Sequence, residues 1–82
     1  LFQEMLSRRP DYRKATFENI AAPTLVMWGK EDEVLHLSCA FEFERLIKRS
    51  EMHLFDGVGH LPMIEAPYLC AQAIKEFVLR NI

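Results

Sequence analysis

The sequence predicts an α/β fold built on part of an open parallel sheet. Two short apolar segments, residues 24–28 and 51–55, have the character of β-strands. A stretch with apolar residues at helical spacing separates them, and a second such stretch follows the later strand. Because a strand, a crossover helix and a second strand form one right-handed parallel unit, we expect the two strands to lie in the same sheet.

The first strand, expected over residues 24–28, is branched and apolar without polar alternation. This pattern is typical of a parallel strand that is covered on both faces. Gly29 ends the strand, and Ser38 is the expected N-cap of the crossover helix. The apolar face of that helix comprises Cys39, Phe43, Leu46 and Ile47. Residues 48–50 end the helix with positive charge, which its dipole favours.

The closing helix has the strongest periodic pattern in the chain. Pro67 is expected as its first residue, with Glu65 favourable near its positive end. Five residues match the helical template, namely Cys70, Ala73, Ile74, Phe77 and Val78. Because Cys39 and Cys70 fall on the inner faces of the two helices, we expect buried and reduced thiols.

The first residues of the chain have a weaker pattern. Residues 1–10 are expected to form the last turns of a helix that Pro10 ends. Residues 11–19 are expected to form a connecting loop, with Phe17 and Ile20 anchored on the core.

Composition limits the classes of function. The 82 residues can form one small domain, and the 50% hydrophobic and 27% charged composition is that of a globular chain. A net charge of −2 provides no basic stripe, so we expect no nucleic-acid partner. The apolar runs are too short to cross a bilayer and no signal pattern opens the chain. We therefore expect no membrane span and a cytoplasmic location.

Two polar turns follow the two expected strands, at the edge of the sheet where ligands of open α/β folds bind. Asp32 lies in the first turn and His60 in the second, glycine-rich turn. An imidazole can accept a proton from a hydroxyl group, and a carboxylate can select its tautomer. For either residue alone, a structural role in its turn is the more common one. Their joint placement predicts a catalytic pair.

Other polar and apolar residues are weaker site candidates. Glu31 and Glu33 could replace Asp32 in principle, although the spacing after Gly29 favours Asp32. Three residues could contact a substrate, with ordinary packing as the alternative, namely Trp28, Leu61 and Met63.

The remaining histidines, His36 and His53, are expected to be surface or half-buried structural residues. Their spacing in the sequence is not that of a metal-binding motif, so we expect no metal site.

The two turns, in this order and at this spacing, resemble the C-terminal portion of the α/β-hydrolase superfamily. Residues 20–32 are similar to the strand and acid turn of that family, and residues 59–67 to its histidine loop and final helix start. The resemblance extends over about residues 17–80. It implies that Asp32 is the acid of a catalytic triad, that His60 is the base, and that no cofactor is needed.

The resemblance also implies a division of the chain. Residues 1–16 would be the tail of a cap-like helix and a connecting loop, and residues 17–82 the C-terminal portion of the hydrolase domain.

The acid turn departs from the family pattern in one respect, because relatives often carry proline two or three residues after the acid. This chain has residues Val34, Leu35 and His36 there.

The serine nucleophile of such enzymes is not found in this sequence. None of the serines Ser7, Ser38 and Ser50 has a glycine two positions away, as a Gly-x-Ser-x-Gly elbow requires. We therefore expect the C-terminal part of a serine-type hydrolase that acts on a small ester, thioester or amide-like acyl substrate and is inactive alone. The alternative is a truncated, non-catalytic module that binds ligands or self-associates.

The expected sheet also lacks neighbours. Two strands and a few helices cannot cover both faces and both edges, and unpaired edges promote aggregation. We expect either an N-terminal remainder or a second copy of the chain to complete the sheet.

Overall fold

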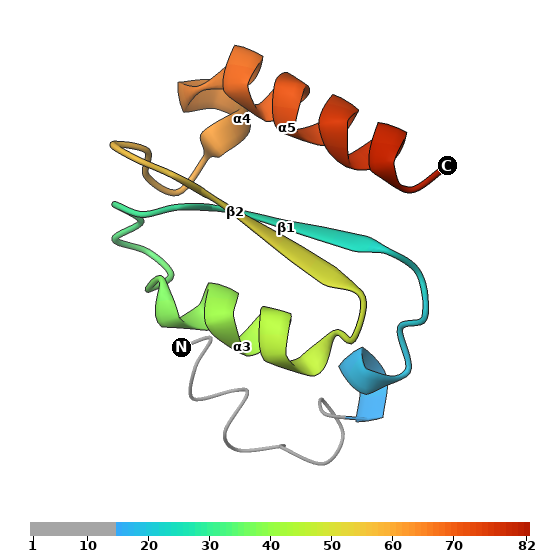
Figure 1. Ribbon diagram of the computed structural model, residues 1–82. Helices are drawn as coiled ribbons and strands as arrows, with labels where there is room; N and C mark the ends of the chain where they lie inside the picture. Colours follow the sequence, from blue (N-terminus) through green and yellow to red (C-terminus); the bar gives the residue numbers. More distant parts are fainter. Residues whose placement is uncertain (1–14) are drawn as a thin grey trace.

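The computed structural model describes residues 15–82 and contains two strands and three labelled helices within that range. Figure 1 shows the elements, which are β1 (Thr24–Gly29), α3 (Ser38–Leu46), β2 (Ser50–Phe55), α4 (Pro62–Glu65) and α5 (Pro67–Arg80). A helical turn over residues 15–18 precedes β1. The helix that the sequence predicts over residues 1–10 lies outside the described residues.

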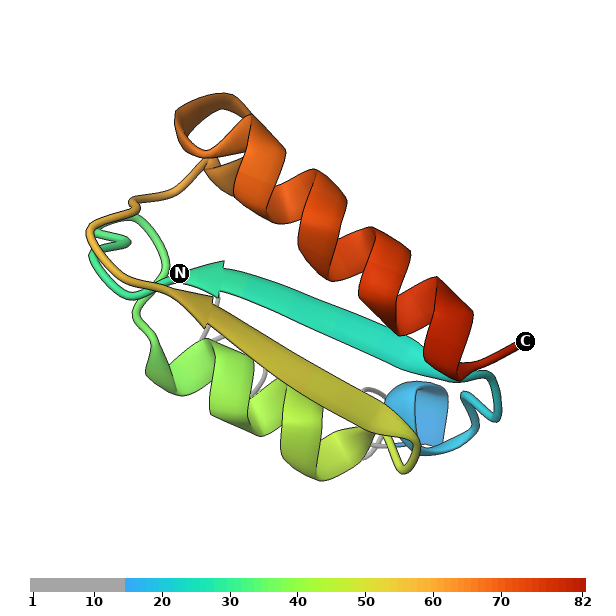
Figure 2. The ribbon, with the colours of Figure 1, turned by 45° about the horizontal axis from the view of Figure 1, so that its top comes forward.

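The two strands form a parallel sheet, which confirms the predicted fold class. Thr24 lies opposite Ser50 at one end of the ladder, and Gly29 lies opposite Phe55 at the other. Helix α5 covers one face of the sheet and α3 covers the other, so the elements form three layers (Figures 1 and 2). Within residues 15–82, each strand pairs on one side alone.

The core lies on both faces of this small sheet. On the α5 face, one cluster contains Phe55, Val58, Cys70 and Ala73, with Met27 and Ala66 packed against it. On the α3 side, the buried residues are Cys39, Ala40, Leu46 and Ile47. Both cysteines are buried and free, as the sequence predicts.

The expected connecting loop is wrong for residues 15–18, which are helical. This turn places Phe17 edge-on against Phe43, with ring centroids 5.2 Å apart and planes at 88°. Phe43 also contacts Trp28 at 6.2 Å between centroids. Phe17 is therefore an anchor, as predicted, and its packing favours the helical turn over an open loop.

The start of α3 differs from the prediction. Leu37, not Ser38, is the N-cap residue, and Ser38 is the first residue of the helix. The backbone N–H of Ser38 donates to Nδ1 of His36 at 3.1 Å, and the Ser38 hydroxyl lies 3.0 Å from the same nitrogen. Nδ1 of His36 thus accepts from the first N–H of the helix, whereas a serine N-cap would accept from an N–H two or three residues later. The N–H of Ala40 instead donates to the carbonyl oxygen of Leu37 at 3.0 Å.

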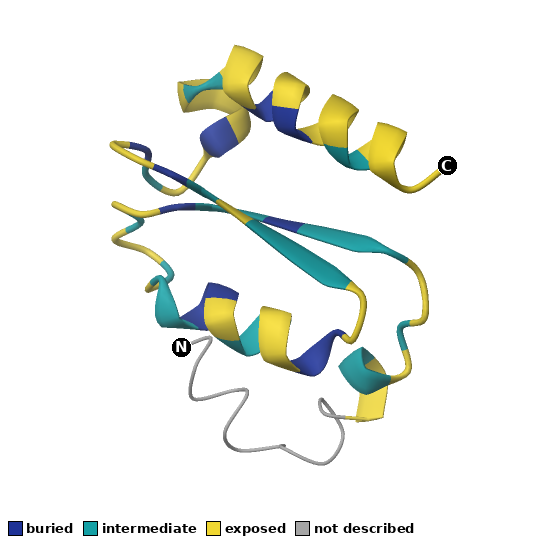
Figure 3. Cartoon of the chain, in the orientation of Figure 1, coloured by how far each residue is buried: buried dark blue, intermediate teal, exposed yellow. Residues whose placement is uncertain are grey.

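Helix α5 begins at Pro67 as predicted, but its apolar face is covered in part. Cys70 and Ala73 are buried, whereas Ile74 and Val78 are 45% and 46% exposed. Figure 3 shows buried and exposed positions side by side along α5. The reason is geometric, because two strands about 5 Å apart are narrower than a helix about 10 Å across. No helix within residues 15–82 has the length and apolarity needed to cross a membrane.

Gly29, the last residue of β1, lies against the backbone of the loop that follows β2. A Cβ atom there would lie 2.1 Å from the carbonyl oxygen of Gly59 and 2.3 Å from that of Val58. Both neighbours are backbone atoms, which cannot rotate away as a flexible side chain could. The loop after β2 therefore crosses directly over the last residue of β1.

We expect Gly29→Ala to lower the free energy of unfolding by about 2 kcal/mol or more, because overpacking against backbone forces the two loops apart. Urea denaturation followed by circular dichroism would measure the loss. Gly57→Asn is the matched control, since Gly57 has φ +67° with nothing within 4 Å of its Cβ position, and asparagine tolerates that conformation. Equal stability of Gly29→Ala and the wild type would contradict the close approach.

Candidate active site

The turn after β1 is organised by one oxygen of Asp32. Its Oδ1 accepts hydrogen bonds from the backbone N–H groups of Val34 and Leu35, both at 2.8 Å. The backbone N–H of Asp32 donates to the carbonyl oxygen of Gly29 at 3.2 Å. Asp32 therefore has the structural role in its turn that is common for aspartate, and this role leaves Oδ2 available.

The same hydrogen bonds bear on the departure from the family pattern. Proline has no backbone N–H, so a proline at position 34 or 35 would remove one of the two donors to Asp32. The indole N–H of Trp28 also donates to the carbonyl oxygen of Leu35 at 3.2 Å. The hydrogen bonds that the Asp32 carboxylate accepts and the one that the Trp28 indole donates therefore fix this turn without a proline.

Backbone hydrogen bonds join the turn after β1 to the turn after β2. The N–H of Lys30 donates to the carbonyl oxygen of Phe55 at 3.0 Å, and the N–H of Glu31 donates to that of Val58 at 2.9 Å. The Lys30 ammonium forms an ion pair with Asp56 at 2.7 Å. The two turns are therefore held in a fixed relative position.

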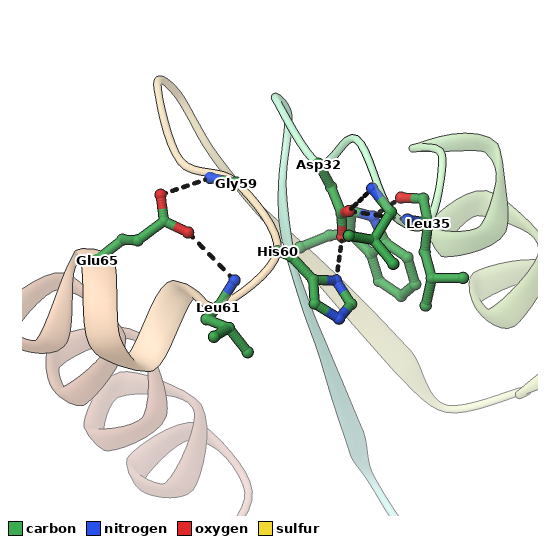
Figure 4. A network of polar contacts seen from close by, with 8 residues as sticks. Asp32, Leu35, Gly59, His60, Leu61 and Glu65 are labelled. Carbon is green, nitrogen blue, oxygen red and sulfur yellow. Dashed lines mark hydrogen bonds and ion pairs between the residues drawn. The ribbon is translucent and has the colours of Figure 1, made fainter.

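This junction brings together the two residues predicted as a pair. Nδ1 of His60 lies 3.0 Å from Oδ2 of Asp32 (Figure 4). The Asp32 side chain is 4% exposed and the His60 side chain 41% exposed. Glu31 and Glu33 are exposed and belong to the solvated part of the turn. The predicted proximity is confirmed, while the catalytic roles stay predictions.

The hydrogen bond defines the tautomer of a neutral His60 ring. An ionised carboxylate can accept hydrogen bonds but cannot donate one, so Nδ1 must carry the proton. Nε2 then has a free lone pair, and in Figure 4 this second ring nitrogen points away from Asp32. A ring in this state can accept a proton at Nε2 from a group outside the pair.

Two opposing effects act on Asp32. Burial alone would raise the pKa of its carboxyl group, because a charged group loses hydration. The hydrogen bonds from His60 and from the backbone N–H groups of Leu35 and Val34, with the charge of His60, outweigh burial and lower that pKa below its ordinary value. Asp32 is therefore ionised at neutral pH.

A cavity of about 160 Å³ opens beside the pair. Its lining contains Met27, Trp28, Gly29, Asp32, Leu35, His60, Pro62 and Met63. Trp28 and Met63 are thus at the position predicted for substrate contacts, whereas Leu61 is 44% exposed and lies outside the lining.

Sequence reasoning missed Met27, Gly29, Leu35 and Pro62 as lining residues. Met27 lies in the middle of an apolar strand, where nothing in the sequence distinguishes it from a core residue. Pro62 is close to His60 in sequence, and that proximity could have identified it.

A second carboxylate contacts the histidine loop. Oε1 of Glu65 accepts a hydrogen bond from the N–H of Gly59 at 2.9 Å, and Oε2 accepts one from the N–H of Leu61 at 3.2 Å. The sequence predicts Glu65 at the positive end of α5, but it belongs to α4, whose N-cap is Leu61. Leu61 and Glu65 are four residues apart, one more than in a capping box, so no capping pattern in the sequence marks this contact.

Within residues 15–82, no group of three or more histidine, cysteine, aspartate or glutamate side chains could hold a metal ion. The polar groups beside the cavity are the carboxylate and the imidazole, and the rest of its lining is largely apolar. The arrangement can therefore accept and return a proton next to an apolar surface.

Comparison with known proteins finds relatives that are named as lipases and hydrolases. No protein-family model matches the chain. It is 32% identical over 79 residues to the monoacylglycerol lipase ABHD6 of Bos taurus, covering 95% of this chain and 23% of that protein.

Solved structures are similar in fold as well as in sequence. The lip1 protein of Acinetobacter baumannii is 36% identical with a TM-score of 0.83, covering 88% of this chain and 24% of that one. The CarC enzyme, a serine hydrolase involved in carbazole degradation, is 34% identical with a TM-score of 0.76. The match covers 79% of this chain and 25% of that one.

The chain spans about a quarter of the length of each of these relatives. The likeness includes the parallel strands and flanking helices that carry the acid turn and the histidine loop. By sequence and by fold, the chain belongs to the α/β-hydrolase superfamily, of which it represents the C-terminal portion.

Proposed function

We propose that this chain supplies the acid and the base of the catalytic triad of a serine-type α/β hydrolase. The observation that carries the proposal is the 3.0 Å contact between His60 Nδ1 and Asp32 Oδ2 at the carboxyl ends of two parallel strands. His60 would accept the proton of the nucleophile at Nε2 and later donate it to the leaving group. Asp32 would hold the tautomer and stabilise the imidazolium.

The proposed substrate is a small acyl compound, with an ester ahead of a thioester or an amide. The apolar lining of the cavity beside His60 supports this choice, because Met27, Trp28 and Met63 suit the carbon chain of an acyl group. One relative is named a monoacylglycerol lipase and another a serine hydrolase, which favours ester chemistry with a serine nucleophile.

The nucleophile is proposed to come from outside the described residues. Ser50 donates its hydroxyl to the carbonyl oxygens of Glu44 and Ile47, at the start of β2, whereas the loop that carries His60 follows the other end of that strand. The hydroxyl of Ser38 contacts His36. An N-terminal segment that carries the nucleophile would also pair with a free strand edge, and a second copy of the chain is the alternative partner for that edge.

A cytoplasmic location of the protein likewise stays a prediction.

We expect the 82-residue chain alone to show no hydrolysis of p-nitrophenyl acetate or p-nitrophenyl butyrate above a buffer blank. The physical reason is that, among the described residues, neither serine hydroxyl contacts His60, so the acyl transfer to serine that the pair would prepare has no nucleophile. Sequencing the coding region upstream of Leu1 complements this assay, since a Gly-x-Ser-x-Gly motif there supports the enzyme. Absence of that motif would favour the non-catalytic module. Activity of the chain alone that disappears in His60→Ala would contradict the need for a separate nucleophile.

In the protein encoded by the full coding region, Asp32→Asn and His60→Ala should each lower kcat by about 10⁴-fold or more, with a smaller change in KM. Each change removes one half of the hydrogen-bonded pair that prepares the nucleophile. Steady-state kinetics with a p-nitrophenyl ester would measure the effect. Glu33→Gln and His53→Ala are controls, because both side chains are exposed and neither contacts the pair. Near-normal turnover of His60→Ala would reject the assignment.

The lowered pKa of Asp32 predicts a pH dependence of stability. A group whose pKa is depressed in the folded state contributes stability above its unfolded pKa, near 3.8, and loses it as the pH falls through the folded pKa. The free energy of unfolding of the wild type should exceed that of Asp32→Asn by about 1–2 kcal/mol above pH 5. The difference should shrink as the pH falls below 3.8 and through the lower pKa of the folded state.

Urea denaturation at a series of pH values would measure this difference. Asp56→Asn is the control, because Asp56 is 87% exposed and its ion pair with Lys30 lies on the surface. A difference that grows as the pH falls would show the opposite sign and contradict the depressed pKa.

A further inference from the structure

The histidine loop is held by a carboxylate on each side of His60. Asp32 contacts the ring, and Glu65 contacts the backbone on the other side, as Figure 4 shows. The Glu65 carboxylate accepts from the N–H of Gly59 at 2.9 Å and from the N–H of Leu61 at 3.2 Å. These two N–H groups belong to the residues immediately before and after His60. The single carboxylate of Glu65 therefore bonds the backbone both before and after His60.

The consequence for the imidazole follows from covalent geometry. The N–H of Leu61 belongs to the peptide group that follows His60, whereas the N–H of Gly59 belongs to the peptide group one before the one that precedes His60. Holding both restricts the backbone torsions of Gly59 and His60, and with them the direction of the His60 Cα–Cβ bond, and leaves two side-chain torsions. The hydrogen bond to Asp32 then selects among the few remaining rotamers. Glu65 thus reduces the number of ring orientations that compete with the one bonded to Asp32.

The surroundings of Glu65 are arranged for this contact. Its own N–H donates to the carbonyl oxygen of Leu61 at 2.9 Å, so Leu61 and Glu65 are bonded in both directions. A Cβ at Gly59 would lie 3.2 and 3.4 Å from the two Glu65 carboxylate oxygens, closer than side chains normally pack. Glycine at position 59 therefore leaves the space that the carboxylate occupies.

We propose that Glu65 is a positioning residue for His60, holding the backbone on both sides of it so that Nδ1 faces Asp32 and Nε2 faces the cavity. The proposal rests on the proposed role of His60 as the base and deepens it. Its test measures the ring and the amide groups directly, so it requires no turnover and stays separate from the tests of hydrolysis.

The experiment is nitrogen-15 NMR of the protein encoded by the full coding region, as wild type and as the variants Glu65→Ala and Glu65→Gln. The ring nitrogen shifts of His60 report the tautomer, the downfield Nδ1 proton reports the bond to Asp32, and amide hydrogen exchange reports the N–H groups of Gly59 and Leu61. Glu76→Ala is the matched control. Glu76 is an exposed glutamate on α5 that accepts a hydrogen bond from Gln72 at 3.3 Å, away from the histidine loop.

In Glu65→Ala, the amides of Gly59 and Leu61 should exchange about tenfold faster than in the wild type, because both acceptors are lost. The Nδ1 proton signal should disappear, and the His60 ring should show a mixture of tautomers. Glu65→Gln should give an intermediate result, since an amide oxygen can accept one of the two bonds. The control should match the wild type in every signal.

Two results would overturn the proposal. One is a Glu65→Ala chain whose loop amides exchange faster while the ring signals of His60 stay as in the wild type. The other is unchanged exchange of both amides. If Glu65→Ala unfolds, as judged by the amides of α5, the same criteria apply to Glu65→Gln, which keeps the size of the side chain. A wild type without the Nδ1 proton signal would instead count against the proposed function as well.

Discussion

The backbone junction between the turns after β1 and β2 is the contact on which the site depends. Hydrogen bonds from Lys30 and Glu31 to the second turn hold the loop ends together, and Gly29 lets the chain cross without a side chain between. Asp32 and His60 are 28 residues apart in sequence, yet the junction places their side chains within hydrogen-bond distance. The geometry of the pair is thus set by backbone contacts, which change less with side-chain substitution than packing does.

Asp32 shows why a structural and a catalytic interpretation of the same residue need not compete. Oδ1 closes the turn through two backbone N–H groups, and Oδ2 bonds the imidazole. The turn role orients the carboxylate that the imidazole requires, and both sets of bonds keep the carboxylate ionised despite its burial. Glu31 and Glu33, with longer and exposed side chains, are held by neither arrangement.

The sequence allowed most of the scaffold and the central pair to be predicted. The strands, the start of α5 and the proximity of Asp32 to His60 follow from local periodicity and from the rule that parallel strands end at one edge. The hydrogen bond from Ser38 to His36, the exposure of Ile74 and the contacts of Glu65 were not predictable in this way. Each depends on which backbone group or surface lies near the side chain after folding, and a local sequence pattern does not specify that neighbour.

The junction also restricts where the length of this chain can change. Glu31 bonds Val58, and Lys30 bonds Phe55 while its side chain pairs with Asp56, so one added residue in the second turn would move several partners out of register. The tight segment between α3 and β2, residues 47–49, has connections of its own at the other end of the sheet, because Ile47 is buried and the carbonyl oxygen of Arg49 accepts from the N–H of Thr24 at 2.9 Å. Insertions and deletions beside His60 would therefore displace the Asp32–His60 pair itself, whereas a change of length between α3 and β2 would disturb scaffold contacts at the opposite end of the sheet.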